Sequence, residues 1–388
     1  MTYTLGVSHS HRWMVCPAAP RMASLSPAIE STPDVDRNTG LDCHYVAEQV
    51  LRANGTVAPR EFVGQLLPYG TLFTIDHAIS VGVYVRDVLD VARHCSEPLL
   101  VEYRTDMGFV APGVVSIIDA AVYDKASRHI TVWDYKNGVT SRDPYYDWQM
   151  IGNGLSAWYK YPDAQRLTLR IVQPNCYTDD PIKSWDIETP ELQRLGLQMR
   201  ERAMLAQQPD APAVPGTHCR GCRAAHTCGA LVEYNKRMLA DMRQMMHNHA
   251  TPQHMTPLEI SMEMDRNNAG LATLKARKEA QDAYAYQLAD KQAVNIPGYK
   301  LVSKRAQRRI TDASTFVETA RTFGYSDALL FHEPKLLSPA QLENVGVNTE
   351  LIEMFVEKPE VGKQLVPMSD NRPAIAAELL ERFKSVIK

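Results

Sequence analysis

The sequence predicts a mixed α/β fold in which a central sheet is flanked by helices. Short β-branched runs alternate with helical stretches over residues 1–235. Residues 113–138 are predicted to form a β-hairpin, because two runs rich in β-branched and aromatic residues enclose the polar segment DKASRH. Residues 256–292 carry a continuous helical pattern that opens on a Thr-Pro start signal. We therefore predict an α/β domain over 1–235, a helical connector over 236–295 and a small α+β domain over 296–388.

The composition is typical of a soluble globular protein. Hydrophobic residues make up 45% of the 388 residues and charged residues 22%, with a net charge of -3 that neither favours nor excludes nucleic acid. No apolar run approaches the roughly 20 residues that a membrane helix requires. The N-terminal residues lack a basic segment followed by an apolar core, so we expect no secretion signal. We expect the chain in the cytoplasm, with its seven cysteines as thiols or ligands.

The predicted hairpin brings two aspartates together. If a four-residue loop joins the strands so that Asp124 faces His129, counting back sets Asp119 directly across from Asp134. Lys136 is then expected across from Ile117 on the same side. Strand alternation also places Asp119 on one face with four other residues: Val115, Ile117, Ala121 and Tyr123.

Two opposed carboxylates on an apolar face repel each other, because directly opposed Cβ atoms are only about 5 Å apart. A divalent cation with oxygen ligands, Mg²⁺ or Mn²⁺, would relieve this repulsion. Lys136 could then reach a phosphate oxygen or the attacking water. The alternative interpretation is an edge hairpin with scattered surface charges, which is what most Asp-x-Lys tripeptides are.

An aspartate on one strand followed by Asp-Tyr-Lys-x-Gly on the next resembles the PD-(D/E)xK core of RecB-like nucleases. The resemblance implies a restriction-endonuclease-like core in which Asp119 and Asp134 bind metal and Lys136 is catalytic. It also implies a helical histidine that completes the metal shell, and the segment GLDCHYVAEQVL supplies His44. Glu102, on the strand before the hairpin, is similar to an acid often found there in the family.

The family usually carries a Gln-x-x-x-Tyr helix after the lysine, which helps to bind DNA. The segment DWQMIGNGLSAWY supplies Gln149, but Asn153 stands where the tyrosine is expected. The nearby tyrosines that could substitute for it are Tyr145, Tyr146 and Tyr159. The residues expected to contact the substrate are Glu102, Tyr146 and Gln149.

Three cysteines follow one another in the pattern Cys-x-x-Cys-x₅-Cys: Cys219, Cys222 and Cys228. A tetrahedral metal site or a cluster requires four soft ligands. From spacing alone, zinc is at least as good an interpretation as an iron–sulfur cluster, with four cysteines or with His218 or His226 in place of one.

A subset of RecB-like nucleases that includes AddB carries an iron–sulfur cluster, with one cysteine before the nuclease core and three after it in this spacing. The resemblance implies that Cys16 is the missing ligand and that a [4Fe–4S] cluster ties the two ends of the nuclease domain together. The residues so implied are Cys16, Cys219, Cys222 and Cys228.

Residues 365–375, LVPMSDNRPAI, resemble the C-terminal signature of an uncharacterised phage and prophage family that has this core. Together the resemblances imply a metal-dependent DNA exonuclease in phage recombination or DNA processing, located in the host-cell cytoplasm. An endonuclease is one alternative, and a non-catalytic DNA-binding or assembly module that keeps the nuclease fold is another. The implied partners are DNA and a phage single-strand annealing protein, with no membrane, and an oligomer would aid processive action.

Overall fold

The computed structural model describes residues 2–26, 35–176, 180–247 and 255–299, together with residues 319, 321 and 322. All of them belong to one compact unit, Met1–Phe331, and a second unit spans His332–Lys388. The predicted boundary at residue 235 falls inside the first unit. The α+β domain predicted over 296–388 lies almost wholly outside the described residues.

Helices and strands alternate along most of the described chain, as the sequence predicts. In chain order they are β1 (Leu5–Gly6), η1 (Val7–His9), α1 (Ser10–Trp13), α2 (Ala19–Leu25), α3 (Val35–Arg52), η2 (Pro59–Phe62), α4 (Ile75–Ala92), β2 (Leu100–Asp106), β3 (Val114–Asp124), β4 (His129–Tyr135), α5 (Trp148–Lys160), β5 (Arg166–Val172), β6 (Ile182–Glu188), α6 (Thr189–Ala206), η3 (Thr217–Cys219), α7 (Gly229–His247) and α8 (Pro257–Lys291).

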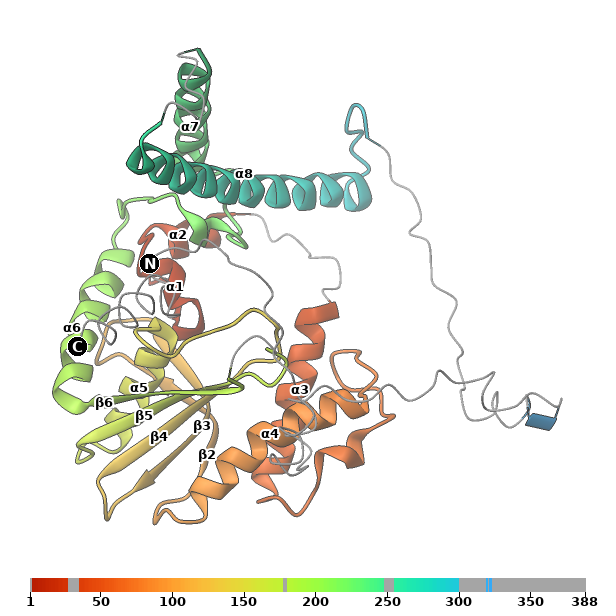
Figure 1. Cartoon of the computed structure of the whole chain (residues 1–388), viewed down its shortest axis with the longest axis vertical. Helices are drawn as coiled ribbons and strands as arrows, with labels where there is room; N and C mark the ends of the chain where they lie inside the picture. Colours follow the sequence, from red (N-terminus) through yellow and green to blue (C-terminus); the bar gives the residue numbers. More distant parts are fainter. Residues whose placement is uncertain are drawn as a thin grey trace, which may run out of the picture. The chain divides into compact units, whose positions relative to one another are not determined.

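The strands form one mixed sheet. β3 pairs in antiparallel fashion with both β2 and β4, and β4 pairs in parallel with β5. The order along the sheet is β1-β3-β4-β5-β6, with β2 beside β3. A parallel pair needs a crossover connection, which α5 supplies between β4 and β5 (Figure 1). The prediction of an α/β fold with a central mixed sheet flanked by helices is confirmed.

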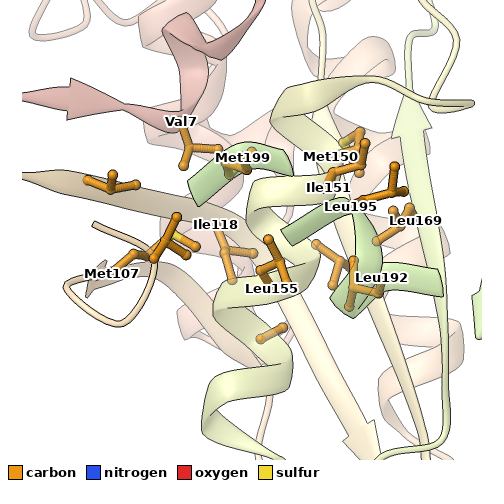
Figure 2. Close-up of a cluster of buried hydrophobic side chains, with 14 of the residues drawn as sticks. Val7, Met107, Ile118, Met150, Ile151, Leu155, Leu169, Leu192, Leu195 and Met199 are labelled. Atoms are coloured by element: carbon orange, nitrogen blue, oxygen red, sulfur yellow. The ribbon is translucent and has the colours of Figure 1, made fainter. Parts of the chain in front are cut away.

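Helices cover both faces of this sheet. On one face α5 and α6 pack on the strands, and Figure 2 shows the core between them, which includes Ile118, Met150, Ile151, Leu155, Leu169, Leu192, Leu195 and Met199. On the other face the core beneath α3 and α4 includes Val46, Val50, Val81, Val88, Ala120, Val122, Trp133 and Tyr135. Because both faces are buried, β3 and β4 are apolar on both sides rather than strictly alternating.

The hairpin of β3 and β4 has the predicted register. Asp124 pairs with His129, and the antiparallel ladder runs from there toward the middle of both strands. It ends one pair before Asp119 and Asp134. Both aspartates therefore lie where the two strands separate, which leaves room for side chains from α3 and α5.

The side-chain alternation of β3 shifts at Asp119, which the sequence did not predict. Ile118 and Ala121 both belong to the core beneath α5, although residues three apart in a regular strand face opposite sides. The neighbouring strand β2 is irregular at the same level. Glu102 has a left-handed φ of 46°, and the β2–β3 ladder skips the pair of Glu102 and Asp119.

Two details of the predicted hairpin face were wrong for this reason. Ile117, predicted on the face of Ala121, pairs with Arg104 of β2 and is 47% exposed. Lys136, predicted opposite Ile117, lies just beyond β4, and its backbone N–H donates to the carbonyl oxygen of Val172 on β5 at 2.9 Å. Beyond the shift, side chains move to the other face, and β3 and β4 no longer oppose each other.

Side chains cap the starts of α8 and α5. The helix predicted over 256–292 is α8, and the Oγ1 of Thr256 accepts the N–H of Glu259 at 3.3 Å while the Glu259 carboxylate accepts the N–H of Thr256 at 2.7 Å. This reciprocal pair is a capping box. α5 begins at Asp147, whose Oδ1 accepts the N–H of Gln149 at 2.8 Å. The cap determines where α5 starts and so where Gln149 lies.

α8 packs on the segment that carries the cysteine motif. The ring of His226 stacks on Tyr284 of α8 with centroids 4.7 Å apart. Arg220 Nε lies 3.5 Å from a carboxylate oxygen of Glu279, also on α8. None of the helices described here is long and apolar enough to cross a membrane.

Candidate functional site

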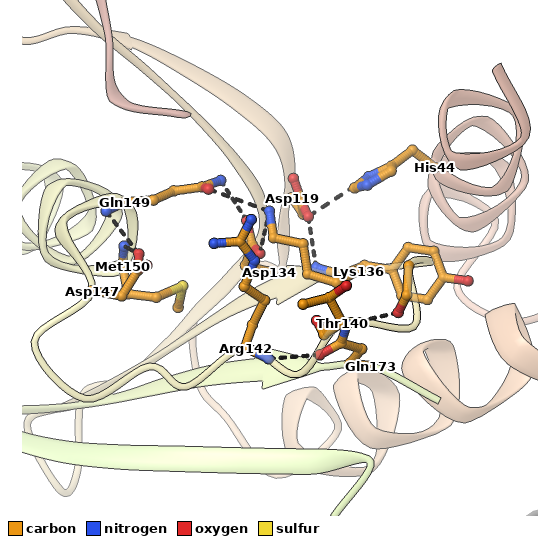
Figure 3. Close-up of polar contacts among 12 residues, drawn as sticks. His44, Asp119, Asp134, Lys136, Thr140, Arg142, Asp147, Gln149, Met150 and Gln173 are labelled. Atoms are coloured by element: carbon orange, nitrogen blue, oxygen red, sulfur yellow. Dashed lines mark hydrogen bonds and ion pairs between the residues drawn. The ribbon is translucent and has the colours of Figure 1, made fainter. Parts of the chain in front are cut away.

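Three side chains from separate elements meet at one end of the sheet. His44 comes from α3, Glu102 from β2 and Asp119 from β3, and one ligand atom of each lies within 4.8 Å of the others. His44 Nδ1 is 3.8 Å from Glu102 Oε1 and 3.6 Å from Asp119 Oδ2, and Figure 3 shows His44 directed at Asp119. In an octahedral ion with bonds of about 2.0–2.1 Å, neighbouring ligands are roughly 3 Å apart and opposite ligands roughly 4 Å. The two distances from His44 lie between these values, so small side-chain movements would bring the three groups onto one Mg²⁺-sized ion.

Local structure explains why these groups meet. α3 buries one stripe of side chains under the sheet, formed by Cys43, Val46, Ala47 and Val50. His44 borders this stripe, and the ring of Tyr135 contacts its edge with centroids 5.3 Å apart. The left-handed backbone of Glu102 interrupts β2 at the level of Asp119. The backbone N–H of Tyr135 donates to Asp119 Oδ2 at 2.8 Å, which fixes that carboxylate.

Asp134 forms an adjacent group with Lys136 and Gln149 (Figure 3). The side chain of Asp134 is 2% exposed, and its Oδ2 lies 2.7 Å from Lys136 Nζ. Gln149 Nε2 donates to Asp134 Oδ1 at 2.6 Å, and Lys136 Nζ donates to Gln149 Oε1 at 3.2 Å. The predicted metal ligands were His44, Asp119 and Asp134. The structure brings Glu102 to the first two, whereas Asp134 pairs with Lys136 and Gln149.

Burial and mutual repulsion shape the charges of the site. Burial raises the pKa of Asp119, although the charges of His44 and Lys136 lower it. Burial likewise raises the pKa of Asp134 against the opposing effect of Lys136. Burial alone would lower the pKa of His44, but Asp119 and Glu102 outweigh it and raise the pKa to about 9. The positive charges nearby thus do not fully offset the burial of the two aspartates, and a divalent cation would supply the missing positive charge.

A buried glutamine that sequence reasoning missed organises the loop after Lys136. Gln173, 3% exposed at the end of β5, donates from Nε2 to the carbonyl oxygens of Gly138 at 2.6 Å and Thr140 at 2.8 Å. Its Oε1 accepts the N–H of Arg142 at 3.0 Å (Figure 3). No motif marks Gln173. The one sequence feature that could have indicated Gln173 is its position as a polar residue directly after the apolar strand β5, which pairs with β4.

The helix of Gln149 shows why the expected tyrosine is absent. Asn153 is 1% exposed, and its Oδ1 accepts a hydrogen bond from Ser116 Oγ at 2.8 Å, so this position faces β3. Tyr159 does not replace the tyrosine. It stacks on Phe109 with centroids 4.1 Å apart, at the far end of α5 and about 15 Å along the helix axis from Gln149.

Tyr146 lies in the loop immediately before α5. Its ring packs on Trp185 of β6 with centroids 5.0 Å apart, and its hydroxyl donates to Glu191 Oε1 at 3.3 Å. Tyr145 lies beside it and is 63% exposed. Both tyrosines are close in the chain to Gln149, which contacts Asp134.

The predicted cysteine ligands line a single cavity: Cys16, Cys219, Cys222 and Cys228. All four thiols are free of disulfide bonds. The first cysteine comes from the turn between α1 and α2, and the other three come from the segment between α6 and α7. The structure therefore brings together cysteines that are far apart in the chain.

Backbone N–H groups point at the sulfur atoms in this cavity. The N–H groups of Val214, Gly216 and Leu231 donate, each at 3.4 Å, to the Sγ atoms of Cys16, Cys219 and Cys228 respectively. Hydrogen bonds to a sulfur favour its deprotonated form, which is the form that binds metals. Such donors also tune iron–sulfur clusters. The donor set fits a site for a soft metal or a cluster.

Each of the two neighbouring histidines has one ring nitrogen within hydrogen-bond distance of a carbonyl oxygen. His218 lines the cavity, but its Nε2 lies 2.7 Å from the carbonyl oxygen of Val214. His226 is turned toward Tyr284, and its Nδ1 lies 3.0 Å from the carbonyl oxygen of Arg223. The buried Nε2 of His226 has no hydrogen-bond partner among the described residues, but His226 does not line the cavity, whereas all four cysteines do. The all-cysteine set is therefore the better fit of the predicted alternatives.

Fold and site define a mixed α/β protein with a buried acidic cluster and a cysteine-lined cavity. The chain matches the family model described as "Protein of unknown function (DUF2800)" over residues 3–373, and it belongs to that family. A solved structure titled "Crystal structure of SSO0001" is similar at 13% sequence identity and a TM-score of 0.29, covering 59% of this chain and 88% of that chain. A TM-score of that size is too low to transfer a fold or a function. No curated protein matches the chain.

Proposed function

We propose that this protein is a metal-dependent deoxyribonuclease that hydrolyses phosphodiester bonds, acting as an exonuclease. The observation that carries the proposal is the meeting of His44, Glu102 and Asp119 within 4.8 Å, beside the buried ion pair of Asp134 and Lys136. These are the residues through which the sequence resembles PD-(D/E)xK nucleases.

Each side chain has surroundings that suit its proposed role. His44, Glu102 and Asp119 would hold Mg²⁺ or Mn²⁺, with Asp134 as a neighbouring carboxylate. An ion in this position would lower the pKa of a bound water and neutralise charge on the phosphate. Burial would lower the pKa of Lys136, but Asp134 and Asp119 outweigh it and raise the pKa. The lysine therefore stays cationic and can stabilise negative charge that develops on the phosphate.

A basic groove beside the cysteine motif supports DNA as the substrate. The groove has a volume of about 320 Å³ and is lined by His9, Arg12 and Arg223, with no acidic residue among the described residues that line it. His9 has its pKa lowered by burial and then by the charges of Arg12, Arg223 and Arg37. The two arginine side chains that line this groove suit a phosphate backbone.

We assign the cysteine cavity to a [4Fe–4S] cluster with a structural role, with zinc as the alternative. The four cysteines and the three N–H donors to sulfur support this assignment. The group would join the N-terminal segment to the segment between α6 and α7. Iron, sulfide and zinc analysis of anaerobically purified protein distinguishes the two, since a colourless protein that contains zinc would reverse the assignment.

The nuclease proposal is tested with end-labelled linear DNA and with closed circular DNA, in Mg²⁺ and in Mn²⁺. We expect wild type to degrade linear DNA from its ends and to leave the circle intact. Lys136→Met should lower the rate by about 10²–10³-fold, and Asp119→Asn by at least as much. The matched control is Asp90→Asn, which removes an exposed carboxylate on α4 that pairs with Arg93 at 2.9 Å. Its rate should equal that of wild type.

Two outcomes would change the conclusion. Cutting of the closed circle would assign an endonuclease. Wild type that binds DNA but digests neither substrate with either ion would instead support the non-catalytic binding module.

A further inference from the structure

Three aromatic rings form a cluster beside the proposed active site. Tyr145 and Tyr146 belong to the loop between β4 and α5, and Trp185 belongs to β6. The ring centroids of Tyr145 and Trp185 are 5.3 Å apart, those of Tyr146 and Trp185 are 5.0 Å apart, and those of the two tyrosines are 4.6 Å apart. Each ring therefore supports the other two, and we call this group the aromatic platform.

The platform is exposed although its rings are large and apolar. Tyr145 is 63% exposed and Tyr146 is 44% exposed, whereas Trp185 is half-buried and packs against the core beneath α5. Tyr146 has a left-handed φ of 53°, which is unusual for an aromatic residue. Glu191 accepts its hydroxyl at 3.3 Å and is itself paired with Arg194 at 2.6 Å. The fold thus holds rigid rings at the surface, at a cost in backbone strain.

Strand pairing locates the platform relative to the proposed metal site. Trp185 pairs with Leu169 of β5, which pairs with Val132 of β4, two residues before Asp134. Trp185 packs on the same face of the sheet as Val132. The spacing between strands and the rise per residue then place Trp185 about 10 Å across the sheet and about 7 Å along the strands from Asp134. A few nucleotides of an extended strand can span that distance.

The chemistry around the platform suits nucleic acid. Lys183 lies two residues before Trp185, and its Nζ is 2.7 Å from Ser141 Oγ and 2.9 Å from the carbonyl oxygen of Arg142. Lys183 and Arg142 therefore both border the loop that carries the two tyrosines. Aromatic faces stack on unpaired bases of any sequence, and basic residues follow the backbone beside them. A duplex keeps its bases stacked on each other and offers no free faces except at its ends.

From this geometry we propose that the aromatic platform stacks on unpaired bases of a single DNA strand as that strand enters the active site. The substrate class is therefore single-stranded DNA, or a frayed end of a duplex. This inference rests on the proposed function for the identity of the ligand. It goes further by naming Tyr145 and Trp185 as specificity-determining residues.

The test compares two single-stranded oligonucleotides of equal length, one with bases and one with abasic sites throughout, by fluorescence anisotropy of full-length protein in EDTA. Stacking on one base is worth about 1–3 kcal/mol, so wild type should bind the base-bearing strand about 5- to 150-fold more tightly than the abasic strand. Tyr145→Ala should lose at least fivefold of that preference. Its affinity for the abasic strand should stay within twofold of wild type, because the phosphates are unchanged.

The matched control is Tyr159→Ala. Tyr159 is 56% exposed and stacks on Phe109 as Tyr145 packs on Trp185, but it lies at the far end of α5. It should keep the full preference for bases. Tyr146→Phe keeps the ring and removes the hydroxyl, and it should also keep that preference. Tyr145→Ala should lower the affinity of the protein for blunt-ended duplex DNA by less than twofold.

Several results would overturn the platform. These are equal binding of both strands by wild type, an unchanged preference in Tyr145→Ala, an equal loss for blunt duplex, or a change of oligomeric state in Tyr145→Ala by sedimentation. Failure of the nuclease proposal looks different. Wild type would then prefer bases in the binding assay yet cut nothing with Mg²⁺ or Mn²⁺. If only the platform proposal fails, the protein would still cleave DNA, and Tyr145→Ala would not change its affinity for single-stranded DNA.

Discussion

The carboxylate site and the cysteine cavity differ in what holds their ligands before any metal binds. At the carboxylate site, Asp134 lies 2.7 Å from Lys136 Nζ, and Asp119 accepts a backbone N–H at 2.8 Å. In the cavity, burial raises the pKa of Cys16 and of Cys219, so these thiols are protonated and neutral near pH 7. One site already holds its charges in place, and the other acquires charge only when a metal displaces the thiol protons.

This difference predicts opposite responses to metal removal. The carboxylate site should keep its geometry as a metal-free protein, because ion pairs and hydrogen bonds within the chain orient its groups. The cysteine cavity should couple metal binding to folding, since its ligands come from two distant segments. The predictions that follow test this contrast.

The largest effect is expected for Cys219→Ser. The variant should lose its bound metal and more than about 3 kcal/mol of unfolding free energy, because binding energy at a structural metal site contributes directly to folding. Metal analysis and thermal unfolding measure both quantities. Cys176→Ser removes a buried thiol outside the cavity and should keep the metal. Equal metal content in the two variants would show that the cavity is not the metal site.

The next effect concerns the buried ion pair. Asp134→Ala should cost about 3 kcal/mol in EDTA, the lower end of the range for buried pairs, because it leaves Lys136, whose side chain is 30% exposed, without its main partner. Lys136→Met should be similarly costly, and the double variant should recover at least half of the sum. Urea unfolding of the wild type, the two single variants and the double variant measures the coupling free energy of this double-mutant cycle. Strictly additive losses would mean that the carboxylate site is not held together by this pair.

Metal addition should give a smaller effect. Mn²⁺ at about 100 times its Kd should stabilise wild type by about 2.7 kcal/mol, since it binds the folded chain and not the unfolded one. Asp119→Asn should abolish this response and Asp90→Asn should keep it. Thermal unfolding over a Mn²⁺ titration is the measurement. A response retained in Asp119→Asn would place the Mn²⁺ site elsewhere.

The smallest effect is the pH dependence of the metal-free protein. The pKa of His44 is raised to about 9 in the folded state, above about 6.5 for the unfolded chain, so folding favours its protonated form. The resulting stability is complete below pH 6.5 and is lost as the pH rises through about 9. With 31% of the imidazole exposed, solvent screening limits the change to about 1–2 kcal/mol. His44→Gln should flatten the profile in chemical unfolding, and an unchanged slope would show that His44 is not its source.

Particular residues show how far sequence reasoning reached. The polar loop and β-branched runs of the hairpin predicted its register correctly, because strand pairing next to a short turn is a local property. The three cysteines of the motif were predicted from spacing, whereas Cys16 was implied only by resemblance. Gln173 and the aromatic partner Trp185 were not predicted at all, because their roles depend on which strands become neighbours.

By itself the sequence determined the α/β class, the hairpin pairing and the start of the long helix at Thr256, since short-range periodicity and capping encode each of them. Only the tertiary structure decided that Glu102, rather than Asp134, joins His44 and Asp119 within 4.8 Å. The physical reason is that a left-handed backbone at Glu102 and the packing of α3 on the sheet act between residues far apart in the chain. No local pattern of side chains encodes such a contact.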